Sequence, residues 1–209
     1  MIEIHNYHKS YQDHHVLSFP ELILPKGIYY FSGINGSGKT TLFKSISGMI
    51  SFEGKCVIDG VEFKDQPVRY RSLVSYCPAE PSFPGYLSLR DMADFVGKAR
   101  KTTSEQLEEL TNILNAQDFF EQPTGAYSSG MLKKSGLLLA LLSKPSVIIL
   151  DEPFTTIDQK TRNILFSLIN NYADQGTTFL ISSHHQHQEE SLSYSGSYLV
   201  QDKTLQRLG

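Results

Sequence analysis

The stretch of sequence that decides the fold is Gly33-Ile34-Asn35-Gly36-Ser37-Gly38-Lys39-Thr40. It fits the pattern G-x-x-x-x-G-K-[ST] and lies between an apolar run at residues 28–32 and a helical pattern at residues 40–46. In such a loop, glycines let consecutive backbone N–H groups face a phosphate chain, and the following helix adds the positive end of its dipole. This order of strand, loop and helix predicts a nucleotide-phosphate site rather than a chance glycine-rich turn.

The residues of this loop and of the first helical turn are the expected contacts of the nucleotide phosphates. They are Asn35, Gly36, Ser37, Gly38, Lys39, Thr40 and Thr41. The ammonium of Lys39 is expected to reach the β- and γ-phosphates, and the hydroxyl of Thr40 is expected to bind Mg²⁺. A nucleotide with a phosphate chain and Mg²⁺ are therefore the predicted ligands.

A pair of carboxylates follows the apolar, β-branched run at residues 147–150. Such a run predicts a central parallel strand that is covered on both faces, and ligands bind at the carboxyl ends of these strands. Asp151 is expected to hold Mg²⁺ through a water, and Glu152 to polarise the water that attacks the γ-phosphorus. Alone, the pair could equally be an acidic turn after a core strand. Together with the phosphate loop, it favours nucleotide hydrolysis.

The rest of the pattern predicts an α/β fold. Residues 2–24 and 56–60 read as antiparallel strands, 89–117 and 161–172 as helical, and 178–181 as another buried strand. A Pro- and Gly-containing stretch at 78–85 predicts a loop. We expect one domain over residues 1–209. It would have a P-loop NTPase core with a mixed central sheet, an N-terminal antiparallel β subdomain, and a helical subdomain inserted at about residues 80–127.

Composition limits the other possibilities. A chain of 209 residues with 40% hydrophobic content can bury one sizeable core, and a net charge of −3 gives no overall attraction to nucleic acid. The most apolar stretch, residues 136–142, is too short to span a bilayer, and the chain start has no secretory pattern. We therefore expect a cytoplasmic protein, with Cys56 and Cys77 reduced and unpaired.

Three further segments resemble those of ABC (ATP-binding cassette) ATPases. Tyr127-Ser128-Ser129-Gly130-Met131 resembles the signature segment, usually Leu-Ser-Gly-Gly-Gln. Residues 153–158 resemble the D-loop, and residues 178–184 resemble the strand that ends at the switch histidine. Order and approximate spacing agree along nearly the whole chain, and the compact form is similar to the ATPase subunits of small bacterial ABC-2-type exporters.

The resemblance implies roles for five more residues. Tyr11 would stack on the adenine ring, and Ser128 and Gly130 would grip the γ-phosphate of ATP bound to the opposite subunit. Asp158 would couple the two sites, and His184 would contact the γ-phosphate and help to orient the attacking water. It also implies a head-to-tail dimer around two ATP molecules and a separate integral membrane permease, with no nucleic-acid partner. The ATPase would then lie on the inner face of the membrane.

Other roles are alternatives for three of these residues. Ser128 could be only a helix cap, and Tyr11 a surface aromatic. A metal site at His184, His185 and His187 is disfavoured because no Cys or acidic ligand set accompanies them.

The sequence departs from the family pattern at the loop after residue 77. Ala79 stands where the family normally has a glutamine that contacts Mg²⁺ and water, and alanine has neither donor nor acceptor. Glu80 is a possible substitute. Because of this departure, a weakly hydrolytic, nucleotide-gated scaffold remains an alternative to a transport ATPase. A soluble ATPase that drives an assembly process, such as iron–sulfur cluster biogenesis, is a further alternative.

Overall fold

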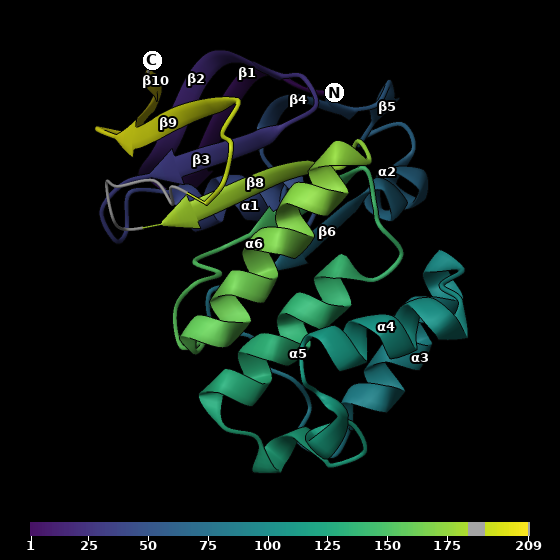
Figure 1. The fold of residues 1–209 in the computed structure, drawn as a ribbon. Helices are drawn as coiled ribbons and strands as arrows, with labels where there is room; N and C mark the ends of the chain where they lie inside the picture. Colours follow the sequence, from purple (N-terminus) through teal and green to yellow (C-terminus); the bar gives the residue numbers. More distant parts are fainter. Residues whose placement is uncertain (184–190, 209) are drawn as a thin grey trace.

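Two sheets and the helices beside them make up residues 1–183 and 191–208, which are the residues that the computed structural model describes (Figure 1). The elements follow in this order: β1 Ile2–Tyr11, β2 His14–Leu24, β3 Ile28–Ser32, α1 Lys39–Ile46, β4 Glu53–Ile58, β5 Val61–Glu62, α2 Pro67–Leu73, β6 Val74–Cys77, α3 Leu89–Arg100, α4 Ser104–Ile113, η1 Gln117–Phe119, η2 Thr124–Ala126, α5 Ser129–Leu141, β7 Val147–Leu150, α6 Gln159–Asp174, β8 Thr178–Ser183, β9 Gly196–Gln201 and β10 Thr204–Leu208.

The central sheet has the strand order β10-β9-β3-β8-β7-β6. Its strands pair in parallel from β9 to β6, and only β10 pairs antiparallel, with β9. Successive side chains of β7 enter opposite cores: Val147 and Ile149 join one hydrophobic cluster, and Ile148 and Leu150 join the other. A strand that is buried on both faces explains the uninterrupted apolar run and confirms the predicted mixed α/β sheet.

The second sheet is antiparallel, with the order β2-β1-β4-β5. Its inward side chains, such as Ile2 and Ile4, share a hydrophobic cluster with Phe43 of α1 and Phe31 of β3. The helix that follows the phosphate loop is therefore packed into the core that joins both sheets. The alternating pattern of residues 2–24 is confirmed as a pair of antiparallel strands.

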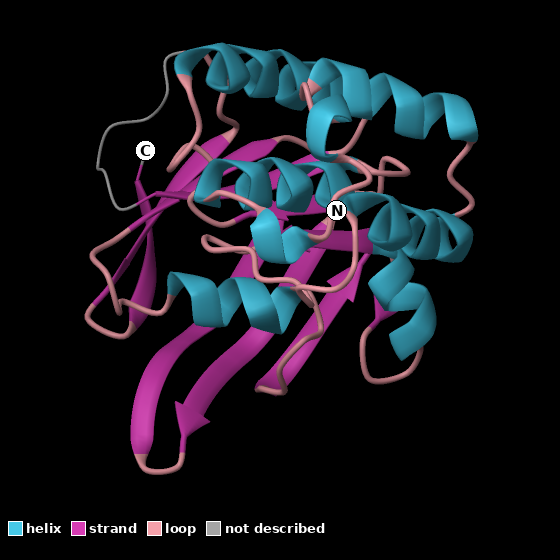
Figure 2. Cartoon of the chain, turned by 90° about the horizontal axis from the view of Figure 1, so that it is seen from below, coloured by secondary structure: helices cyan, strands magenta, loops and turns pink. Residues whose placement is uncertain are grey.

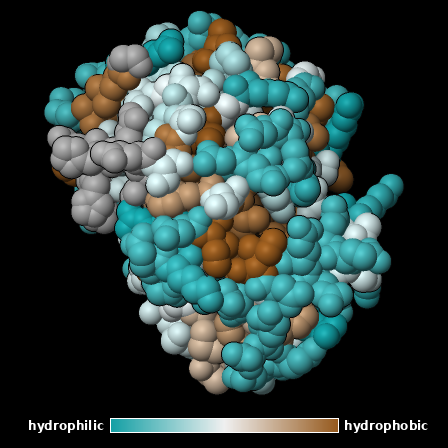
Figure 3. Space-filling model, in the orientation of Figure 1, coloured by the Kyte–Doolittle hydropathy of each residue, from teal (hydrophilic) through white to brown (hydrophobic). Residues whose placement is uncertain are grey.

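Helices α3, α4 and α5 form the part of the molecule farthest from the antiparallel sheet, whereas α2 packs beside β5 of that sheet. α3 and α4 lie at the lower right of Figure 1, and seen from below the helices stand in front of the strands (Figure 2). Capping boxes begin α3 at Ser88 and α4 at Thr103. Lys101, with φ of 59°, ends α3 and breaks the continuous helical pattern that the sequence suggested. Figure 3 shows an apolar surface patch near the middle of this face, over the region of α5, among hydrophilic side chains.

Some elements were not predicted from the sequence. They are α2, β6 and the hairpin of β9 and β10, which occupies the short polar end of the chain. Cys56 and Cys77 are free thiols, and both are buried. No helix within residues 1–183 and 191–208 combines the length and the apolar character needed to cross a membrane.

Candidate functional site

The phosphate loop joins β3 to α1 and is shaped by its glycines. Gly38 occupies the N-cap of α1 with φ of 111°, a conformation that side-chain-bearing residues rarely adopt. A Cβ at Gly33 would lie 2.5 Å from the carbonyl oxygen of Val200. Among the residues that the structure describes, no side chain caps α1, and the first turn of this helix contains no acidic residue. The positive end of the helix is therefore available to an anion.

Lys39 lies across the base of this loop. Its Nζ donates to the carbonyl oxygens of Gly33 at 2.6 Å and Ile34 at 3.1 Å, and only 6% of the residue is exposed. Burial lowers the pKa of Lys39, and the nearby charges of Glu152 and Asp151 act in the opposite direction. The ammonium is thus held beside the loop amides and near both carboxylates.

Asp151 lies at the carboxyl end of β7 and is 1% exposed. Its Oδ2 accepts hydrogen bonds from the hydroxyls of Thr40, at 2.7 Å, and Tyr76, at 3.1 Å. Its Oδ1 accepts a hydrogen bond from Ser182. Burial raises the pKa of Tyr76, and the charge of Asp151 raises it further, so that the phenol remains a donor. Three hydroxyls therefore hold a buried carboxylate in place.

Glu152 follows with a left-handed backbone, at φ of 48°. Its N–H donates to the hydroxyl of Ser182 at 2.9 Å, and its carbonyl oxygen accepts from Thr155 Oγ1 at 2.8 Å. This left-handed residue follows directly after Asp151, one residue beyond the end of β7. Such conformations cost about 1–3 kcal/mol and are concentrated at functional sites.

A cavity of about 400 Å³ runs over the loop to the two carboxylates. Its lining contains the whole predicted set from Asn35 to Thr41 together with Asp151 and Glu152, and also His14, Val16 and Ala79. The structure therefore brings the two predicted halves of the site together.

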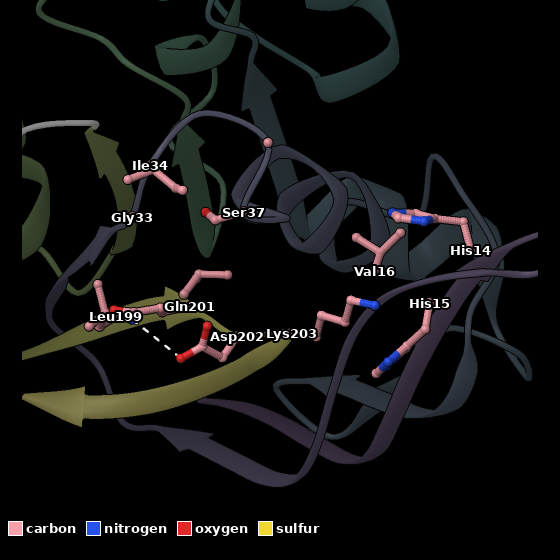
Figure 4. Close-up of a pocket in the computed structure, with 12 residues that line it drawn as sticks. His14, His15, Val16, Gly33, Ile34, Ser37, Leu199, Gln201, Asp202 and Lys203 are labelled. Carbon is pink, nitrogen blue, oxygen red and sulfur yellow. Dashed lines mark hydrogen bonds between the residues drawn. The ribbon is translucent and has the colours of Figure 1, made fainter.

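A second cavity, of about 500 Å³, adjoins the first. The two share His14, Val16, Gly36 and Ser37 in their linings. Figure 4 shows the side chains around it, which come from β2, the phosphate loop and the β9–β10 hairpin. The phosphate cavity is thus continuous with a space large enough for more of a nucleotide.

Four of the residues assigned by resemblance lie outside the lining of the phosphate cavity, as far as the described residues go: Tyr11, Ser128, Gly130 and Asp158. Tyr11 ends β1, is 48% exposed, and has the ammonium of Lys9 4.5 Å from its ring centre. His184, like His185 and His187, lies outside the described residues.

The other two polar side chains of this set act as helix caps. The hydroxyl of Ser128 accepts from the N–H of Met131 at 3.3 Å and begins α5, and Asp158 accepts from the N–H of Thr161 at 2.8 Å and begins α6. Both side chains are exposed, so a capping role leaves them accessible.

The donor set fits Mg²⁺. Thr40 Oγ1 and Asp151 Oδ2 lie 2.7 Å from each other, and hard oxygen ligands of this kind suit a small divalent cation. In residues 1–183 and 191–208, no group of three or more His, Cys, Asp or Glu side chains is placed to bind a metal without other ligands. A cation here would need phosphate oxygens or water to complete its shell.

Sequence reasoning missed Tyr76, Ser182, His14 and Val16. Tyr76 and Ser182 come from β6 and β8, the strands on either side of β7, and both lie near strand carboxyl ends. Hydroxyl residues at the ends of apolar strands were the available signal, but the strand order was needed to place them beside Asp151.

Comparison with known proteins identifies the family. Residues 22–155 match the family model described as ABC transporter. The lantibiotic transport ATP-binding protein SrtF of Streptococcus pyogenes is 26% identical over 208 residues, which cover 98% of this chain and 89% of SrtF.

Two solved structures share the fold. An ATP-binding subunit of an ABC transporter gives a TM-score of 0.90 at 22% identity, over all of this chain and 90% of that one. The ATP-binding cassette MJ0796, solved as a dimer in a post-hydrolysis state with ADP and Pi, gives 0.86 at 17% identity, over all of this chain and 99% of that one. The resemblance and the fold class are confirmed, and the chain belongs to the ABC transporter family as an ATP-binding, ATP-hydrolysing domain.

Proposed function

We propose that two copies of this chain close head to tail around two ATP molecules and drive a separate integral membrane permease as an exporter. The observation that carries this proposal is the position of Ser128 and Gly130. These residues open the 13-residue helix α5 but lie outside the phosphate cavity of their own chain, among the residues described. A second molecule is therefore needed to bring a signature segment to the γ-phosphate. The dimeric form of MJ0796 supports this arrangement.

Within each site, the residues divide the work by their chemistry. The amides from Asn35 to Thr41 and the ammonium of Lys39 bind the phosphates, and Tyr11 stacks on the adenine. Thr40 and Asp151 hold Mg²⁺, which would neutralise charge that develops on the phosphate oxygens. Glu152 polarises the attacking water, His184 orients it, and Asp158 couples the two sites.

The chain is proposed to form one domain over residues 1–209, with a helical subdomain at about 80–127. A cleft of about 650 Å³ between this helical part and the core is the proposed docking site of the permease. Its lining includes Met49, 61% exposed, and Phe95, 76% exposed. Exposed apolar side chains around a groove are typical of a protein contact. Docking there would hold the ATPase on the inner face of the membrane. The name of SrtF, a lantibiotic transport protein, supports a transport role.

Size-exclusion chromatography tests the dimer. With ATP and Mg²⁺, Glu152→Gln is expected to elute at twice the mass of the 23.5-kDa chain, because ATP that cannot be cleaved keeps the sandwich closed. With ADP it is expected to elute as a monomer. The matched control is Glu152→Gln combined with Ser128→Glu, which places a negative charge against the γ-phosphate and is expected to stay monomeric. A monomer of Glu152→Gln at high protein concentration with saturating ATP would contradict the proposal.

Ala79→Gln is expected to raise ATP turnover by roughly two- to tenfold. Ala79 lines both the phosphate cavity and a cavity of about 580 Å³ that also reaches Glu80 and Glu152, so a longer polar side chain has room. One added hydrogen bond in the transition state contributes about 0.5–1.5 kcal/mol. Steady-state phosphate release measures the change. Ala79→Leu supplies the bulk without the amide and is expected to give no gain. Equal rates for the glutamine variant and the unmodified chain would mean that Glu80 or another group already makes this contact.

The absence of an amide at Ala79 also favours a second candidate, a nucleotide-gated scaffold with little hydrolysis. Steady phosphate release by the unmodified chain that disappears in Glu152→Gln would exclude it.

A further inference from the structure

Lys133 is a buried cation that none of the roles above uses. It lies in the second turn of α5, with no exposed surface. Its Nζ donates to three backbone carbonyl oxygens: Ala79 at 2.9 Å, Asp151 at 3.2 Å and Pro78 at 3.3 Å. An ammonium has three N–H donors, so these bonds use its full capacity.

The three acceptor carbonyls belong to segments that have different roles in the proposed function. Asp151 and its neighbour Glu152 belong to the hydrolytic site. Pro78 and Ala79 begin the loop that lines both the phosphate cavity and the cleft beside α3. Lys133 itself is on the helix that begins with the signature segment. One side chain therefore connects the catalytic strand end, the loop between site and cleft, and the signature helix.

Close backbone packing accompanies this connection. A Cβ at Gly136, one turn along α5, would lie 2.7 Å from Pro81 Cγ and 3.1 Å from Cys77 Sγ. The N–H of Asp151 donates to the carbonyl oxygen of Cys77 at 2.9 Å. Loop, strand end and helix are thus in direct contact with one another.

A buried lysine is energetically unfavourable for a purely structural contact. Removing an ammonium from water carries a large desolvation penalty, and an apolar side chain of similar volume often stabilises the fold as well or better. Because its acceptors are main-chain carbonyls, Lys133 can hold the loop at Ala79 even though Ala79 has no polar side chain of its own.

We propose that Lys133 is a positioning residue for ATP hydrolysis, which fixes the loop at Ala79 and the strand end at Asp151 to the signature helix. This inference rests on the proposed function, since it assumes that the site turns over ATP. In this role Lys133 supplies, through the main chain of the loop, a connection that the side chain of Ala79 cannot make.

The test compares Lys133→Met, Lys133→Gln and the unmodified full-length chain. For Lys133→Met we expect kcat to fall by roughly 10- to 100-fold with the KM for ATP within about twofold, because a misplacement of about 1 Å can cost about 100-fold in rate. The melting temperature is expected to stay the same or rise, since an apolar side chain fills the site. Lys133→Gln keeps two N–H donors and is expected to recover part of kcat.

Lys144→Met is the matched control. Lys144 follows α5 but is exposed and bonds to the side chain of Gln175, so its removal is expected to leave kcat unchanged. A stable Lys133→Met or Lys133→Gln variant with unmodified kcat would overturn the inference. A loss of kcat that only follows a lower melting temperature would do the same, because it indicates a structural role. If Lys133→Met does not fold, Lys133→Gln decides by the same criteria.

The two proposals fail in different ways. Should the unmodified chain release no phosphate and form no ATP-dependent dimer, the proposed function fails and the role of Lys133 with it. Should the unmodified chain do both while Lys133→Met and Lys133→Gln match its kcat, only the role of Lys133 fails.

Discussion

Replacement of Glu152 by glutamine is expected to lower the kcat of ATP hydrolysis by roughly 100- to 10,000-fold, the range that a positioned general base contributes. The substitution keeps the size of the side chain and removes its negative charge and its ability to accept a proton. The backbone N–H of Glu152 is held by Ser182, and its carbonyl oxygen by Thr155, so the left-handed turn does not depend on the carboxylate. ATP affinity is therefore expected to stay within about threefold.

Phosphate release at saturating ATP measures kcat for this variant, and titration with ATP in the presence of Mg²⁺ measures its affinity. Glu108→Gln is the matched control because Glu108 is exposed on α4 and lines neither cavity at the phosphate loop. More than a tenth of the unmodified rate in Glu152→Gln would assign the base to another residue.

Replacement of Lys39 by methionine is expected to weaken ATP binding by roughly 10- to 100-fold. A charge-assisted hydrogen bond contributes about 1.5–3 kcal/mol, and the ammonium is expected to serve both the β- and the γ-phosphate. Methionine retains an apolar stem of similar length, so the packing beneath the loop is preserved. Turnover at subsaturating ATP should fall at least in proportion.

The specific readout for Lys39 is the difference between nucleotides. Affinity for ATP should fall much more than affinity for AMP, which lacks the β- and γ-phosphates. Lys26→Met, which removes an exposed lysine just before β3, should change neither affinity. An equal loss for ATP and AMP would show that Lys39 supports the shape of the loop instead of binding the terminal phosphates.

The parts of the fold that were predicted correctly are those with a strong local pattern. The run at β7 and the loop before α1 each indicate their structure within a few residues. Burial on both faces of a strand requires consecutive apolar residues, and the tight loop requires glycines at particular positions. β6 is different. Its buried Ser75 accepts from Arg100, and its Tyr76 bonds Asp151, so its burial depends on partners that are 25 and 75 residues away.

The same distinction applies to the site. Lys39, Thr40 and Asp151 were predicted because a spacing pattern and a strand end point to them. Ser182 reaches Asp151 only because β8 is the neighbour of β7 in the sheet, and a local pattern does not contain strand order. No local pattern marks Lys133 as buried, because its burial depends on the carbonyl groups of two segments distant in the sequence.

The cap of α5 has a consequence for which residue can serve there. A hydroxyl group can accept the Met131 N–H and, with its own proton, donate to an oxyanion at the same time. An aspartate would cap the helix equally well, but it offers no proton and would repel a triphosphate. In the proposed dimer, serine at position 128 would let one oxygen atom keep α5 capped while it binds and releases an anion, so that repeated cycles would not need to unwind the helix.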